Sequence, residues 1–288
     1  MSGLEGRGPE GIRTPDLLNA IQTRSQLSHG PTSRSWFRSL RIPAASGHPR
    51  AAATISPGFQ PHMQTREITT SELRGGAYTA MPDGGGPFPG VVVIHEAYGL
   101  NDNIRNITRR FADAGYAALA ADLFTGRNRA ICMTRYMAGM LLGSVNRYGI
   151  DDLKAALTYL ARLPEVDAQR LGAIGFCMGG GFAIAWACTD SRLKAIAPFY
   201  GVNPRPLEVV KRSCPVVGSY PGRDFTAGAG RSLETALAQH GIAHDIKIYP
   251  DSRHSFFNDT RPAHDKEAAD DSWRRVLKFF GEQLVKKN

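Results

Sequence analysis

The chain has 288 residues, of which 42% are hydrophobic, so it can bury a sizeable core in one large domain or two small ones. Its formal net charge is +9, but acids and bases are mixed along the chain and form no basic run interleaved with aromatic residues, which argues against a nucleic-acid partner. No apolar stretch approaches the roughly 18 residues of a membrane span, so we expect no membrane insertion.

Residues 1–62 differ in composition from the rest of the chain. They contain seven arginines, three acids and no lysine, without helical or strand periodicity. They also lack the continuous apolar core of a secretory signal peptide. Residues 11–15 (GIRTP) could be encoded by DNA that resembles the complement of a transfer-RNA T-arm, which makes Met63 a candidate initiator. We therefore expect a disordered extension over residues 1–62 and one catalytic domain over residues 63–288.

From about residue 88 onward, short apolar runs alternate with segments of helical periodicity. Buried strands are predicted at residues 89–95, 116–124, 170–176, 193–201, 214–220 and 245–249. Helices are predicted at residues 102–114, 130–162 with a break near 143–149, 178–188, 228–240 and 266–285. This alternation indicates an α/β fold in which helices cover both faces of a mostly parallel central sheet. Such sheets place their functional residues at the carboxyl ends of the strands.

The motif GFCMGG, at residues 175–180, lies between a predicted strand and a predicted helix. It has the form of the G-x-S-x-G nucleophile elbow, with Cys177 in place of serine. The turn is so sharp that side chains at Gly175 and Gly179 would collide with neighbouring backbone, and the helix directs its N-terminal N–H groups at the thiol. A free cysteine is more often a small buried hydrophobic residue. That is what we expect of the other three, Cys132, Cys188 and Cys214.

The four cysteines form no CxxC pair and none has zinc-like spacing to a histidine. So few cysteines in a chain of this length do not make a disulfide framework. We therefore expect no metal, and a reducing compartment such as the cytoplasm.

A nucleophilic thiol needs a base and a group that orients the base, and in this kind of fold the chain order is nucleophile, acid, histidine. Asp224 follows the strand predicted at residues 214–220, and His254 follows the strand predicted at residues 245–249. Both therefore lie at strand ends, in the required order. The remaining downstream histidines, His240, His244 and His264, lie in or beside predicted helices or at the start of a strand.

His95 and Glu96 end the first central strand, where a charged residue is unusual after a fully apolar run. One reading is that Glu96 is a solvated loop acid. The other is that Glu96 touches the thiol and that the N–H groups of Ala97 and Met178 form an oxyanion hole.

Several segments together resemble the dienelactone hydrolase family of the α/β-hydrolase superfamily: HEAYGLNDNIRNITRRFADAGYAALAADLF, GFCMGGG, FYG, GRD and DSRHSFFND. The resemblance covers about residues 65–285. It implies that Cys177 is the nucleophile, that His254 is the base with Asp224 as its orienter, and that Glu96 contacts the cysteine and helps to control its ionisation. It also implies carboxymethylenebutenolidase activity, which opens a dienelactone to maleylacetate, without a metal or organic cofactor.

Members of that family hold the substrate carboxylate with arginines, one shortly after the strand that corresponds to ADLF and one four residues after the histidine. The second position is Asn258 here, and the first falls near Arg127. An amide does not easily replace a bidentate arginine contact. Arg127 and Arg253 are therefore the candidate substrate-binding arginines, together with Tyr98 beside the predicted oxyanion loop.

These observations predict a cysteine-dependent hydrolase of a small lactone or ester, active as a monomer or small homo-oligomer. A second hypothesis is a thiol redox sensor or binding protein on the same fold, because fold alone does not determine function. The intact order of cysteine, aspartate and histidine favours the hydrolase. A third hypothesis, nucleic-acid binding, depends mainly on the basic residues of 1–62.

Overall fold

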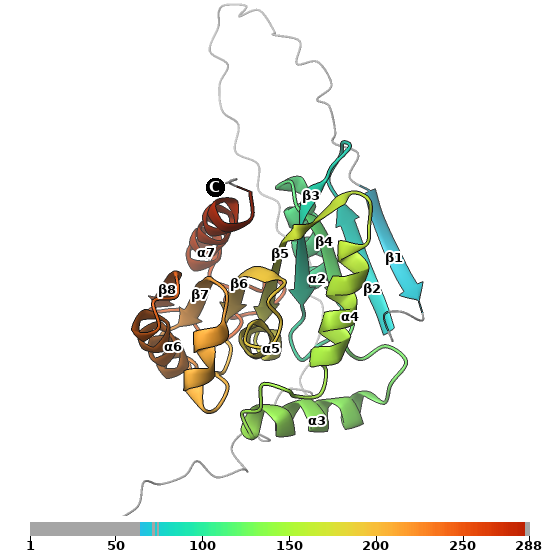
Figure 1. Cartoon of the computed structure of the whole chain (residues 1–288). Helices are drawn as coiled ribbons and strands as arrows, with labels where there is room; N and C mark the ends of the chain where they lie inside the picture. Colours follow the sequence, from blue (N-terminus) through green and yellow to red (C-terminus); the bar gives the residue numbers. More distant parts are fainter. Residues whose placement is uncertain (1–63, 71–72, 74, 286–288) are drawn as a thin grey trace, which may run out of the picture. The chain divides into compact units, whose positions relative to one another are not determined.

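The computed structural model describes residues 64–70, 73 and 75–285. The expected extension over residues 1–62, and Met63 itself, lie outside the described residues. Eight strands form one sheet in the order β1-β2-β4-β3-β5-β6-β7-β8 (Figure 1). The six strands from β4 to β8 in this order are parallel to one another, and β2 and β1 add an antiparallel edge.

The element bounds agree with the predicted alternation of strands and helices. The strands are β1 Gln64–Thr70, β2 Gly75–Met81, β3 Phe88–Ile94, β4 Ala117–Ala121, β5 Val166–Phe176, β6 Leu193–Phe199, β7 Val216–Pro221 and β8 His244–Tyr249. The helices are α2 Asp102–Asp113, α3 Arg129–Leu141, α4 Ile150–Ala161, α5 Met178–Ala187, α6 Ala227–Gln239 and α7 Lys266–Phe280, with the short turns η2 Leu207–Arg212 and η3 Gly281–Val285. The predicted break in the long helical region is confirmed between α3 and α4.

The β1–β2 edge was not among the sequence predictions. Its strands read QTREITT and GGAYTAM, without the continuous apolar run that marks the buried central strands. They are strands because they pair with each other and with β4, a tertiary contact that no local pattern reveals.

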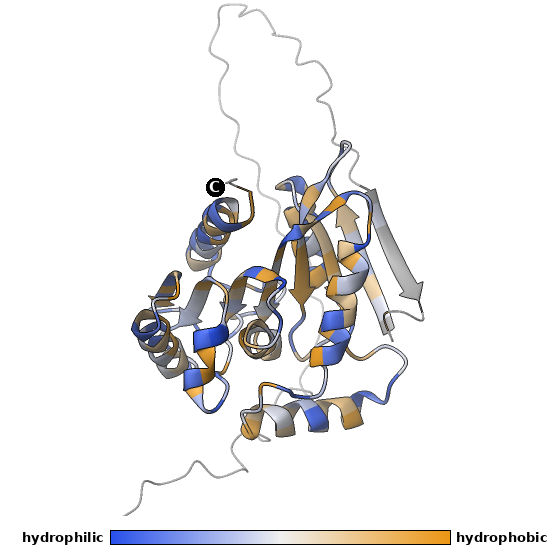
Figure 2. Ribbon diagram, in the orientation of Figure 1, coloured by the Kyte–Doolittle hydropathy of each residue, from blue (hydrophilic) through white to orange (hydrophobic). Residues whose placement is uncertain are grey.

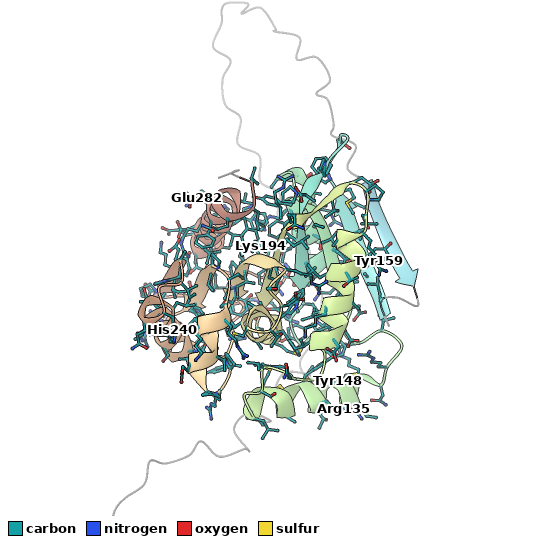
Figure 3. All side chains as sticks on the ribbon, viewed as in Figure 1. Arg135, Tyr148, Tyr159, Lys194, His240 and Glu282 are labelled. Carbon is teal, nitrogen blue, oxygen red and sulfur yellow. The ribbon has the colours of Figure 1, made fainter. Side chains whose placement is uncertain are left out.

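Alternate residues of the central strands supply the two halves of the core. On β3, Val92 and Ile94 pack in one cluster with residues of α4, α5 and α6, whereas Val91 and Val93 pack in the other with residues of α2 and α7. This two-residue alternation is what a strand covered on both faces requires. Figure 2 shows the resulting hydrophobic central strands, and Figure 3 shows the side chains that fill the space between sheet and helices.

Helix α2 illustrates how the sequence sets an element end. Asn101 caps its N-terminus by accepting a hydrogen bond from the Ile104 amide at 3.1 Å. The apolar side chains of Ile104, Ile107 and Phe111 are buried on one face. Among the described helices, none combines the length and apolar character needed to cross a membrane.

Candidate active site

Cys177 lies between β5 and α5 in a backbone conformation that a side chain rarely adopts, with φ 55° and ψ −113°. Its amide donates to the Phe199 carbonyl at 3.0 Å, and its own carbonyl accepts from the Gly181 amide at 3.2 Å. The left-handed region costs a non-glycine residue of the order of 1–3 kcal/mol, and such strain gathers at functional sites. The strand and the helix on either side hold Cys177 in this conformation.

The glycines around Cys177 are required by space, as the sequence predicted. A Cβ on Gly175 would lie 2.1 Å from the Gly179 carbonyl oxygen, and one on Gly179 would lie 2.4 Å from the Ile94 carbonyl oxygen. These distances are far inside van der Waals contact with backbone that cannot rotate away. Glycine at 175 therefore lets the first turn of α5 lie against the end of β5, and glycine at 179 lets α5 approach the carboxyl end of β3.

His254 is paired with the predicted acid. Its Nδ1 hydrogen bonds to Asp224 Oδ2 at 2.8 Å. Burial lowers the pKa of His254, but hydrogen bonds to Asp224 and Cys177 outweigh burial and raise the pKa to about 10. The structure therefore brings together Cys177, His254 and Asp224, from three separate strand ends, in the predicted order.

Asp224 and the His254 ring each have a further partner that the sequence analysis missed. Burial alone raises the pKa of Asp224, yet hydrogen bonds from His254 and Thr226 lower it below its ordinary value, so the carboxylate stays ionised. The ring of Phe225 stacks on the His254 ring, with centroids 5.6 Å apart and planes 13° apart. Phe225 and Thr226 directly follow Asp224 in the chain, so their closeness in sequence is the signal from which they could have been predicted.

Glu96 is the centre of a buried hydrogen-bond network, and its expected contact with the thiol stays a prediction. Glu96 is 2% exposed, and both of its oxygens have other partners. Oε1 accepts hydrogen bonds from Ser255 Oγ at 2.9 Å and from Tyr200 Oη at 3.3 Å, and Oε2 accepts one from Asn258 Nδ2 at 2.8 Å. Glu96 is therefore not a solvated loop acid, and no hydrogen bond among the described residues joins it to Cys177. It fixes the loop that carries His254.

Tyr200 links this network to the catalytic residues. Its ring lies 4.9 Å from the His254 ring, centroid to centroid. Burial raises the pKa of Tyr200 well above its usual value, and the nearby Glu96 and Cys177 raise it further, so the hydroxyl keeps its proton. The non-glycine residues with positive φ in the described part of the chain are Cys177, Tyr200 and Ser255, and all three belong to this site.

His95, next to Glu96, is a structural residue. Its Nε2 accepts a hydrogen bond from the Leu123 amide, so Nδ1 carries the proton and donates to the Glu96 carbonyl at 2.6 Å. Burial lowers the pKa of His95, which keeps the ring neutral. His240, at the end of α6, is exposed at the periphery of the molecule, as Figure 3 shows.

The predicted oxyanion hole has two free donors. Within residues 75–285, no protein oxygen accepts a hydrogen bond from the amide of Ala97 or of Met178. Met178 opens α5, where the helix dipole favours negative charge. Backbone amides that have no acceptor in the protein can donate hydrogen bonds to the negative oxygen that develops during attack on a carbonyl.

The two arginines predicted to bind substrate are placed differently. The Arg127 guanidinium forms two hydrogen bonds to Asp152, of 2.6 and 2.9 Å, and stacks on the Tyr148 ring at 5.5 Å. Because its fork is already occupied by a carboxylate, Arg127 has no free bidentate face for a ligand, and this prediction is not supported. Arg253 is exposed and makes no side-chain contact within the described residues that would orient it toward the thiol.

Two other arginines lie against the predicted oxyanion loop. Arg129 donates to the Ala97 carbonyl at 2.9 Å. The Arg261 guanidinium lies 3.8 Å above the ring of Tyr98, which is 48% exposed. The sequence offered no periodic or motif signal for either one, since both contacts join residues more than 30 positions apart.

The described residues contain no cluster of three or more histidine, cysteine, aspartate or glutamate side chains able to hold a metal ion. The four cysteines are free thiols, and Cys132 and Cys188 are buried. Burial raises the pKa of Cys188 to about 11, so it is not a nucleophile at neutral pH.

Comparison with known proteins agrees with the geometry. The family model of the dienelactone hydrolase family matches residues 76–284. A protein of Saccharolobus solfataricus named "Putative carboxymethylenebutenolidase" is 33% identical over 241 residues, which cover 71% of this chain and 92% of that protein.

Solved structures give the same relationship. The crystal structure of a "Putative Dienelactone Hydrolase" from Klebsiella pneumoniae has a TM-score of 0.66 at 26% identity and covers 76% of this chain and 99% of that chain. A dienelactone hydrolase-like promiscuous phosphotriesterase from metagenomic libraries has a TM-score of 0.67 at 26% identity, covering 77% and 99%. The fold is thus the α/β-hydrolase fold, and the chain belongs to the dienelactone hydrolase family.

Proposed function

We propose that this hydrolase uses Cys177 as a nucleophile to cleave small lactones or carboxylic esters through a thioester. The observation that carries the proposal is the placement of Cys177, Asp224 and His254 at the carboxyl ends of three parallel strands, with His254 Nδ1 hydrogen-bonded to Asp224 Oδ2 at 2.8 Å. The raised pKa of His254, about 10, keeps its imidazolium protonated at neutral pH beside the sulfur, which favours the thiolate.

The chemistry follows from these positions. The Cys177 sulfur attacks the carbonyl carbon, and the carbonyl π electrons move to an oxygen held by the Ala97 and Met178 amides. Collapse of this intermediate breaks the carbon–oxygen bond of the ester, and the His254 proton goes to the leaving alkoxide. In a lactone that alkoxide stays tethered to the acyl group.

Deacylation uses the same groups. His254, now neutral and oriented by Asp224, takes a proton from water as the water oxygen attacks the thioester carbon. Breaking the carbon–sulfur bond releases the carboxylic acid and returns the thiolate. Tyr200, Ser255 and Asn258, held on Glu96, keep the His254 loop in the required position.

Two arginines support a preference for substrates that carry a carboxylate. Arg129 and Arg261 lie against Ala97 and Tyr98, on the loop that supplies one oxyanion donor. A guanidinium matches a carboxylate with two parallel hydrogen bonds. We propose Arg129 and Arg261, in place of Arg127, as the residues that attract the substrate carboxylate. Because the four cysteines are free, we also propose a reducing compartment such as the cytoplasm.

The decisive experiment compares the wild type with Cys177→Ala and Cys177→Ser on a dienelactone and on p-nitrophenyl acetate. We expect kcat/KM to fall by roughly a thousandfold or more in Cys177→Ala. Mass spectrometry of the wild type during turnover should show an acyl adduct on the peptide that contains Cys177. Full activity in Cys177→Ala, or peroxide-dependent oxidation of Cys177 without any ester turnover, would rule out the proposed mechanism.

A further inference from the structure

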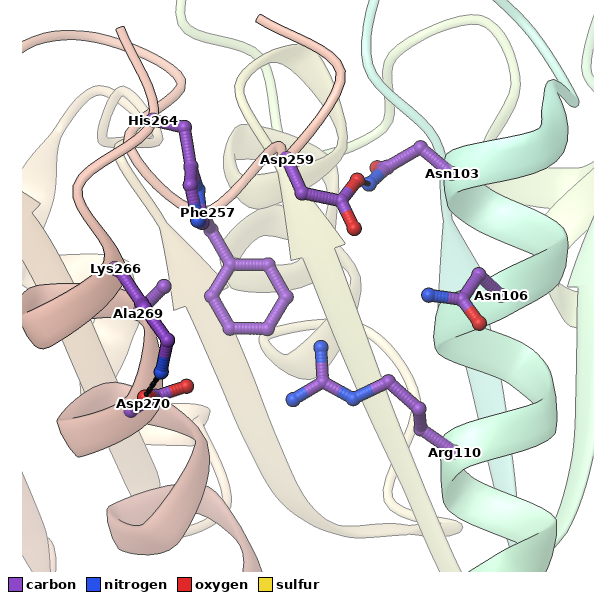
Figure 4. A pocket seen from close by; sticks show the side chains of 9 residues that line it. All are labelled: Asn103, Asn106, Arg110, Phe257, Asp259, His264, Lys266, Ala269 and Asp270. Atoms are coloured by element: carbon purple, nitrogen blue, oxygen red, sulfur yellow. Dashed lines mark hydrogen bonds and ion pairs between the residues drawn. The ribbon is translucent and has the colours of Figure 1, made fainter. Parts of the chain in front are cut away.

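A pocket lies between α2, α7 and the loop that joins β8 to α7. Its volume is about 290 Å³, enough for a small metabolite. The residues that line it include Asn106, Arg110, Phe257, Asp259, Ala269 and Asp270, as Figure 4 shows. None of the proposed catalytic side chains lines it.

The most informative group in this pocket is the Arg110 guanidinium. Its central carbon lies 4.2 Å from the Trp273 ring centroid and 5.3 Å from that of Phe257, so two aromatic rings fix its place. Within the described part of the chain, no oxygen accepts a hydrogen bond from it. Burial lowers the pKa of Arg110, while the charges of Asp259 and Asp270 raise it, and an arginine stays protonated in any case. The guanidinium therefore keeps its donors free for a ligand.

The two carboxylates of the pocket differ in their partners. Asp270 forms an ion pair with Lys266. Asp259 has no cationic partner among the described residues, since its one hydrogen bond comes from the neutral amide of Asn103 at 3.0 Å. Figure 4 shows Asp259 on the opposite side of the cavity from Arg110, with the amide of Asn106 beside the gap. Arg110 and Asp259 thus face the same small space, and no direct ion pair within the described residues joins them.

A neighbouring groove shows that this imbalance is not a general property of the surface. That groove lies between the end of β8 and α7 and has a similar volume, about 300 Å³. There, however, Lys247 and Arg274 both pair with Asp271, and Asp265 accepts a hydrogen bond from Ser252. Because the cations of this groove are already paired, the reasoning applied to Arg110 predicts no ligand there.

We propose that the pocket between α2 and α7 binds a small zwitterion, a free α-amino acid. Its carboxylate takes the free donors of Arg110 and the amide of Asn106, and its ammonium group binds Asp259. A plain carboxylate would leave Asp259 unmatched, and a plain amine would leave Arg110 unmatched. The ring of Phe257 and the methyl group of Ala269 offer an apolar wall to the side chain. The site does not depend on the proposed hydrolase mechanism.

Binding is measured by calorimetry on the full chain with each of the common amino acids. We expect saturable binding of at least one, and much weaker binding of its matched analogues that lack either the ammonium group or the carboxylate. Arg110→Met and Asp259→Asn should each weaken binding roughly 10- to 100-fold, the effect of losing one charged hydrogen bond. Asp259 is exposed, so its conservative replacement tests the site even where Arg110→Met fails to fold.

The matched control is Arg231→Met, which removes an exposed arginine from α6 and should leave the affinity unchanged. Cys177→Ala should also bind as the wild type does. The proposal is overturned if no amino acid binds or if the analogue without an ammonium group binds equally well. It is also overturned if Cys177→Ala abolishes binding, which would place the ligand in the catalytic site.

Discussion

The buried contact between Glu96 and Asn258 offers the sharpest test of how the His254 loop is held. Asn258→Asp would put a second carboxylate 2.8 Å from Glu96 Oε2, where an amide now donates a hydrogen bond. At an effective dielectric constant of about 20, two charges at that distance repel by roughly 6 kcal/mol. The protein can avoid this repulsion by protonating one acid, whose ordinary pKa is about 4, at a cost of about 4 kcal/mol at pH 7. The smaller of these two costs, about 4 kcal/mol, is therefore the expected loss in the free energy of unfolding.

The double variant Glu96→Gln/Asn258→Asp should recover most of that loss. The new glutamine can donate its amide to the aspartate, while its carbonyl still accepts from Tyr200 and Ser255. The aspartate can still accept from the amide and hydroxyl of Thr260, as Asn258 Oδ1 does now. We expect the free energy of unfolding of the double variant to lie within about 1–2 kcal/mol of the wild-type value. The charged hydrogen bond between residues 96 and 258 is restored there, with donor and acceptor exchanged.

Urea unfolding of the wild type, both single variants and the double variant measures this coupling. In thermal unfolding at pH 7, Asn258→Asp alone should lower the midpoint temperature by about 8–16 °C, at roughly 2–4 °C per kcal/mol for a domain of this size. Its defect should shrink toward pH 4, where the two acids can share a proton. If the effects of the single variants simply add in the double variant, the contact between residues 96 and 258 does not hold the loop.

Three further predictions concern the same site. Gly179→Ala should destabilise the protein by about 3 kcal/mol or more, or prevent folding, because its methyl group would lie 2.4 Å from the Ile94 carbonyl oxygen; a midpoint within 1 °C of the wild type in thermal unfolding would refute the steric argument. The folded pKa of His254, about 10, lies above its ordinary value of 6.5, so the stabilising effect of His254 is complete below about pH 6.5 and is lost as the pH rises through about 10. The difference in free energy of unfolding between wild type and His254→Gln should therefore shrink over that interval. A difference that grows with pH would contradict this linkage. Arg129→Met and Arg261→Met should raise KM roughly 10-fold for an ester with a carboxylate and little for p-nitrophenyl acetate, and equal effects on both substrates would remove these arginines from carboxylate binding.

Much of the fold and the catalytic order could be read from the sequence because both depend on short-range rules. Strand and helix periodicities are local, and the parallel arrangement follows from their alternation. The glycines beside Cys177 are needed by a turn only a few residues long. The bounds of β6 and α5 consequently agree with prediction within two residues. The sequence positions of Asp224 and His254 follow from the same rule that sites lie at strand ends.

The partners of individual side chains depend on how loops that are distant in the sequence pack together. Glu96 meets Tyr200, Ser255 and Asn258, which lie 104 to 162 positions away, because the loops after β3, β6 and β8 converge. Arg127 turns to Asp152 on α4 instead of to the site. Such choices depend on distances of a few ångströms between loops, and hydrogen bonds lose their strength within that range. Local sequence patterns place the reactive groups along the sheet edge, whereas the packing of distant loops sets which groups they touch.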